Sequence, residues 1–127
     1  MLKLIYTELG LHMDYEAASL EAVVSQHVIL SMRTGHSLHV ERGQASFLLP
    51  VQASGLEALD SALHRYAETL EVTCVDAEYV EVDLGGTWMA QTIDAHEGMF
   101  FAAYDYETEL ILHRLWHAVG LPLTSVT

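Results

Sequence analysis

The chain has 127 residues, of which 51% are hydrophobic, so it is long enough to bury the core of one domain. Its 18 acidic residues against 5 basic ones give a formal net charge of −13, which argues against nucleic acid and anionic membranes as partners. Cys74 is the only cysteine, so an intrachain disulfide is excluded and a reducing cytoplasm is favoured. No apolar run suits a signal peptide or a membrane span. We expect residues 1–127 to form a single cytoplasmic domain.

The first third of the chain predicts a hairpin followed by a helix. Residues 2–6 and 11–15 resemble short strands, and Gly10 can supply the turn between them. Ser19 is a suitable N-cap for a helix that Gly35 can close. Six apolar residues recur at helical spacing and are expected to share the buried side: Leu20, Val23, Val24, Val28, Leu30 and Met32.

The middle of the chain predicts a second hairpin and a second helix. Residues 37–41 and 45–49 alternate in polarity, and Arg42-Gly43 between them can form the turn. The run from Ser54 to Leu70 begins with the Ser-x-x-Glu spacing of a capping box and continues with apolar residues at helical intervals. We therefore expect a helix over this run.

The last third predicts more strands and a final helix. Gly85-Gly86 has the composition of a two-residue hairpin turn, and residues 94–98 form a second polar turn. The final helix is predicted over residues 105–119 and is closed by Gly120. The strands expected before that helix are residues 72–75, 79–84, 87–93 and 99–104.

The predicted order is ββαββαβββα. Short turns between successive strands imply an antiparallel or mixed sheet, and three amphipathic helices need an apolar sheet face to cover. We therefore expect an α+β fold, a two-layer sandwich in which three helices cover about six to seven strands.

The final helix carries the closest histidine pair. His113 and His117 are four residues apart, and Glu109 precedes them by one further turn, so all three fall on one ridge predicted to face away from the core. Such a ridge can hold a transition metal such as zinc. It is not an HExxH motif, because Arg114, Leu115 and Trp116 lie between the histidines. The competing interpretation is a pair of solvated histidines and no cofactor.

Two other side chains are expected to point inward. His27 falls within the apolar side of the first helix, so its ring nitrogens need fixed hydrogen-bond partners. It is a candidate for a catalytic base, although a structural histidine satisfied by its neighbours explains the same pattern. Cys74 is expected to face inward from a strand as an inert thiol.

A possible partner or ligand surface comes from the Gly85-Gly86 turn. A two-residue loop there would place Trp88 on the acidic face of the sheet, opposite the face with the valines, and an aromatic side chain in that position suits a contact surface. Loop residues His96 and Glu97 could extend the site. The proposed surface is Tyr79, Glu81, Asp83, Trp88, His96 and Glu97.

No phosphate-binding loop, nucleophile elbow or CxxC pair occurs in the sequence. The high apolar fraction leaves little polar surface for an isolated small monomer. We therefore favour a non-enzymatic interaction or accessory domain that binds a protein, including a second copy of itself. The alternatives are a metal-binding or histidine-dependent enzyme around His113 and His117, and a small-molecule binding domain with a cleft between sheet and helices.

Overall fold

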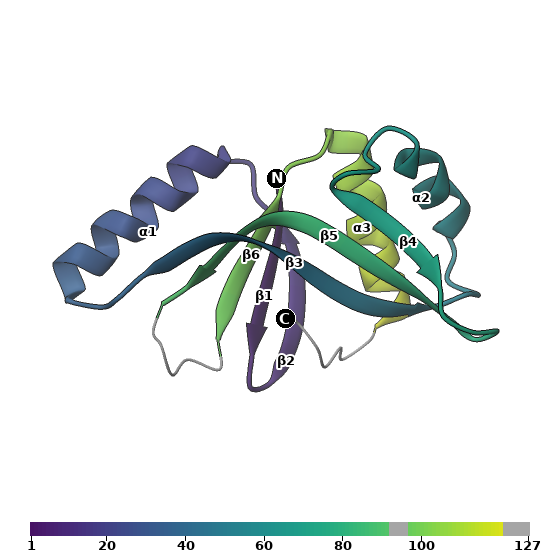
Figure 1. The fold of residues 1–127 in the computed structure, drawn as a ribbon, viewed down its shortest axis with the longest axis horizontal. Coiled ribbons are helices and arrows are strands. Elements are labelled where there is room, and N and C mark those ends of the chain that lie inside the picture. The colour runs from purple at the N-terminus through teal and green to yellow at the C-terminus, as the bar shows by residue number, and fades with distance from the viewer. Residues whose placement is uncertain (92–96, 121–127) are drawn as a thin grey trace.

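The computed structural model describes residues 1–91 and 97–120, which form one antiparallel sheet and three helices (Figure 1). The predicted α+β class and two-layer arrangement are confirmed, with six strands. The strands are β1 (Leu2–Thr7), β2 (Gly10–Tyr15), β3 (His39–Pro50), β4 (Leu70–Cys74), β5 (Tyr79–Ala90) and β6 (Gly98–Ala102). The helices are α1 (Leu20–Thr34), α2 (Leu56–Leu63) and α3 (Tyr106–Val119).

Strand β5 joins the two ends of the sheet. The strand order is β2-β1-β6-β5-β3, and β4 also pairs with β5. One edge of β5 pairs with β3 along its whole length, while the other edge pairs with β4 over residues 80–84 and with β6 over residues 87–89. Strands β3 and β5 consequently run the length of the molecule, from the α1 end to the α2 end (Figure 1).

Two predicted hairpins are wrong, because Arg42-Gly43 and Gly85-Gly86 lie inside the continuous strands β3 and β5. Gly86 pairs with Gly43 and lies so close to the Phe101 carbonyl that a Cβ atom would overlap it. The Gly85 amide donates to the Thr69 carbonyl at 2.8 Å. These glycines permit close backbone approach at the point where β5 changes its partner from β4 to β6.

The sheet buries side chains on both faces, but unequally. The main core lies beneath α2 and α3, and a smaller cluster on the opposite face includes Val23 of α1 with Met89 and Phe101 of the sheet. Because Phe100 belongs to the main core and Phe101 to the smaller cluster, alternation along β6 places α1 on the opposite face from α3.

Helices α1 and α3 have the predicted boundaries. Ser19 accepts a hydrogen bond from the Ala22 amide at 3.2 Å, and Gly35 ends α1 in the left-handed region at φ 73°. Asp105 caps α3 by accepting from the Thr108 amide at 2.8 Å. Gly120 has a φ of 57° after the last turn. Among the helices of the described segments, none is long and apolar enough to span a bilayer.

Helix α2 is shorter than predicted. It begins after Gly55 without a side-chain cap, so the expected capping box does not form. It ends at Leu63. The chain then turns into β4, and this turn is closed by hydrogen bonds from the Thr69 and Leu70 amides to the Tyr66 carbonyl. Leu70, predicted to be the last apolar residue of the helix, is instead the first residue of β4.

Candidate functional site

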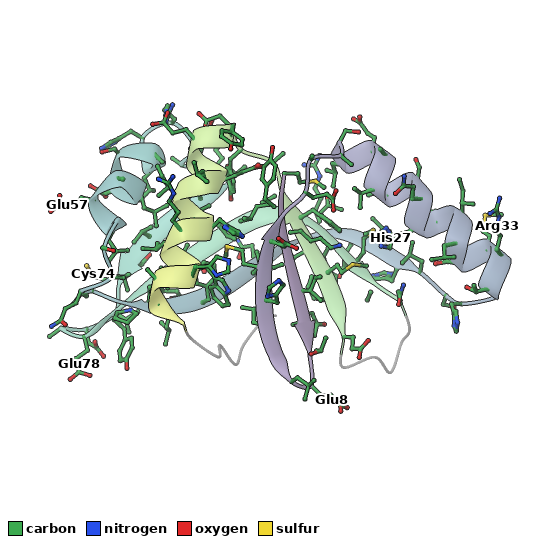
Figure 2. The ribbon with its side chains drawn as sticks, turned by 180° about the vertical axis from the view of Figure 1, so that it is seen from behind. Glu8, His27, Arg33, Glu57, Cys74 and Glu78 are labelled. Carbon is green, nitrogen blue, oxygen red and sulfur yellow. The ribbon has the colours of Figure 1, made fainter. Side chains whose placement is uncertain are left out.

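Helix α1 packs against the sheet mainly through the side that carries Val23 and Ser31. Its C-terminal half projects beyond the strands, and Arg33 lies at the outer tip of the molecule (Figure 2). Four neighbouring apolar side chains remain exposed there, the largest fractions being 79% for Met32 and 53% for Leu30. We define the outer patch of α1 as Val28, Ile29, Leu30 and Met32.

The outer patch corrects the prediction for this helix. Val28, Leu30 and Met32 were expected on the buried side, yet all three are exposed, because α1 turns the side with Val23 and Ser31 inward. Residues 22–34 contain no Asp or Glu, although the whole chain carries a net charge of −13. The outer patch is therefore apolar, and Glu21 in the first turn is the only acidic residue of α1.

His27 lies between α1 and the sheet (Figure 2). It is half-buried, and its Nδ1 lies 2.8 Å from the Val23 carbonyl oxygen one turn earlier. Its side chain borders a hollow of about 190 Å³ whose other lining residues are Ile5, Thr7, Met89, Gln91, Glu97, Gly98 and Met99. The structure thus brings His27 and Glu97 to one hollow, while His96 lies outside the described residues.

On α3, His113 and His117 approach one another. Their Nε2 atoms are 3.2 Å apart, and the ring planes are inclined by 63°. Asp14 of β2 approaches the pair, and its Oδ1 lies 4.0 Å from the His113 Nε2. His117 is exposed and His113 is half-buried, so solvent reaches the pair.

Glu109 does not accompany the histidines, contrary to the prediction that it faces outward. Its side chain is buried, and a 2.7 Å ion pair between Oε2 and the Met1 ammonium group compensates the buried charge. Its Oε1 accepts a hydrogen bond from the Tyr104 amide at 3.2 Å. In residues 1–91 and 97–120, no group of three or more His, Cys, Asp or Glu side chains is close enough to hold a metal ion.

The buried carboxylate also affects its neighbour Tyr104. Burial raises the pKa of the Tyr104 hydroxyl, and the charge of Glu109 raises it further. The protonated hydroxyl donates to the Thr69 carbonyl at 2.7 Å. Tyr104 and the Met1 ammonium escaped the sequence analysis, because nothing in the spacing of these residues indicates that they meet Glu109.

The expected acidic surface with Trp88 is divided between the two faces of the sheet. Tyr79, Glu81 and Asp83 share one face, and Asp83 accepts a hydrogen bond from Ser46. Trp88 lies on the other face, where it stacks on Tyr6 with ring centroids 4.8 Å apart. The reason is the continuous strand β5, which keeps Trp88 on the same face as Val82.

Cys74 is exposed at the end of β4, contrary to the expectation of an inward-facing thiol (Figure 2). It pairs with Val80, which is buried. Because β4 lies at an edge of the sheet, the side chain of Cys74 is exposed to solvent even though Val80, its partner on β5, is buried.

These features define the class: a small acidic α+β domain with an apolar, partly uncovered helix at one end and a histidine pair on α3. The Alr0857-like family profile matches residues 1–120, so the chain belongs to the Alr0857-like family. No curated protein and no solved structure matches the chain.

Proposed function

We propose that the chain is a protein-interaction domain that binds a second copy of itself through the outer patch of α1. The observation that carries this proposal is the exposure of Met32, Leu30 and Ile29 on a helix with both ends capped. A cluster of large exposed apolar side chains is typical of a binding surface. A helix that leaves large apolar side chains exposed also gains stability when a partner covers them.

A second copy fits the charge distribution. The net charge of −13 makes most surfaces of two copies repel each other. Residues 22–34 lack acidic groups and include Arg33, so contact between the outer patches of two copies brings no pair of carboxylates together. A strongly basic partner would instead be attracted to the acidic remainder of the surface.

The geometry suits an isologous pair of helices. A helix of 15 residues spans about 22 Å, and a two-fold axis across α1 would bring the same patch of each protomer together. Four partly exposed apolar side chains per protomer contribute on the order of 1–2 kcal/mol each against the entropy cost of association. We therefore expect a reversible dimer whose population depends on concentration.

The test is sedimentation equilibrium over a wide concentration range. The wild-type chain is expected to dimerise, and the double variant Ile29→Glu with Met32→Glu should weaken dimerisation by at least about 100-fold, because charge is placed in an apolar contact. Ala58→Glu, at an exposed site on α2, is the matched control and should dimerise as the wild type does. A wild-type chain that stays monomeric at several hundred micromolar would contradict the proposal.

A further inference from the structure

The histidine pair on α3 has the geometry of a metal chelate. A divalent transition ion binds imidazole nitrogen at about 2.0–2.1 Å, so two nitrogens on a tetrahedral ion lie about 3.3 Å apart. The Nε2 atoms of His113 and His117 are 3.2 Å apart. The separation of the two nitrogens therefore matches that of two imidazole ligands on one ion.

We propose that His113 and His117 bind one divalent transition ion of the zinc, nickel or copper type, with Asp14 as the adjacent carboxylate. Two imidazoles favour these borderline ions over calcium and magnesium, which require oxygen ligands. Water completes the coordination, since no described group of three or more ligand side chains surrounds the pair. This site is separate from the outer patch of α1, because α1 lies at one end of the molecule and α3 lies in the other half (Figure 1).

Asp14 is positioned to assist the chelate. Its Oδ1 lies 4.0 Å from the His113 Nε2, and its side chain is 58% exposed, so a rotation of the side chain can bring it to the ion or to a bound water. The negative charge of Asp14 and the net charge of −13 both attract cations to this surface. An ion held by α3 and approached by Asp14 would connect the helix to β2.

Glu109 takes no part in this site, in contrast to the assignment from helical spacing alone. Its two oxygens are already engaged by the Met1 ammonium and the Tyr104 amide. The carboxylate next to the pair is instead Asp14, which comes from a strand that is distant in sequence, and periodicity along the helix cannot reveal it.

The test is calorimetric titration of tag-free protein with Zn²⁺, together with thermal unfolding at the same metal concentrations. We expect one ion per chain, a micromolar dissociation constant, and a rise in Tm of about 10 °C when Zn²⁺ is present at about 100 times that constant. His113→Ala and His117→Ala should each weaken binding at least about 100-fold, and Asp14→Asn about 10-fold.

His36→Ala is the matched control, because His36 is exposed and lies beyond the far end of α1. It should bind Zn²⁺ as the wild type does, and circular dichroism of each metal-free variant checks that the fold is kept. Two results would overturn the proposal: no binding by the wild type at about 100 μM Zn²⁺, or unchanged binding by both His113→Ala and His117→Ala. Unchanged affinity in Asp14→Asn would remove Asp14 from the site.

Discussion

Helices α1 and α3 are close in length and are both capped at each end, yet they have different surroundings. Helix α3 buries Leu112, Leu115 and Trp116 against the main core. Helix α1 buries Val23 and leaves the outer patch exposed. The difference shows that apolar periodicity predicts the helix itself, whereas the extent of the sheet beneath it decides how much of the apolar surface is covered.

The largest expected effect comes from truncating the core beneath α3. Phe100 is fully buried, so Phe100→Ala should lower the free energy of unfolding by about 3–5 kcal/mol in urea titrations. Phe101→Ala removes the same ring from the opposite face of the same strand and should cost less than Phe100→Ala, because α1, which buries few side chains, can close part of the cavity. Equal losses would show that the two faces are packed alike.

The buried ion pair at the N-terminal end of α3 predicts the next largest effect. Glu109→Gln leaves the Met1 ammonium buried without a counter-charge and should cost about 3 kcal/mol in the free energy of unfolding. Glu107→Gln, an exposed change in the same turn, is the control and should be close to neutral. A small loss in Glu109→Gln would indicate that water reaches the ammonium group.

At Asp105 we expect a smaller effect on the free energy of unfolding, and this effect depends on pH. The hydrogen bond from the Thr108 amide, with further hydrogen bonds and the nearby Arg65, lowers the pKa of this carboxyl below its ordinary value of 3.8. The charged form therefore stabilises the folded state at neutral pH, and this contribution is lost as the pH falls from about 4 through the lowered pKa. Asp105→Asn should be less stable than the wild type at pH 7, and the difference should shrink on acidification.

Asp60→Asn on α2 is the control for the removal of one acidic charge. The difference in the free energy of unfolding between Asp60→Asn and the wild type should stay constant over the same pH range. A difference between wild type and Asp105→Asn that stays constant down to pH 2 would show that the charge of the cap contributes nothing.

The smallest effect is expected on the outer patch. Met32→Ala should change the free energy of unfolding by less than about 0.5 kcal/mol when the protein is dilute, because 79% of Met32 is already exposed. Leu112→Ala on α3 should cost about 2–5 kcal/mol under the same conditions. A large loss in dilute Met32→Ala would mean that this side chain is covered within a single chain.

Local signals were sufficient for much of the fold. Ser19 and Gly35 mark the ends of α1, and the turn before Gly10 separates β1 from β2, because caps and tight turns depend on a few adjacent residues. The glycines at 85 and 86 misled the prediction, because a glycine that permits close approach to Phe101 looks in sequence like a glycine that permits a turn.

The candidate site was only partly predictable. The spacing of His113 and His117 indicates that they meet, since residues four apart on a helix are neighbours. The proximity of His113 to Asp14 depends on how β2 is placed against α3 in the fold, and no local sequence pattern encodes that placement. The ion pair of Glu109 with the Met1 ammonium likewise joins residues far apart along the chain.

Strand β3 ends the sheet, and no other strand of the described chain pairs with its outer edge. An unpaired edge of 12 residues is a template for the growth of aggregates, which proteins restrain with charge on or near the edge. Here exposed Glu41 and Arg42 lie on the strand, and the net charge keeps copies apart. Near the isoelectric point of about 4.7 this restraint weakens, so storage and crystallisation are best kept well above that pH.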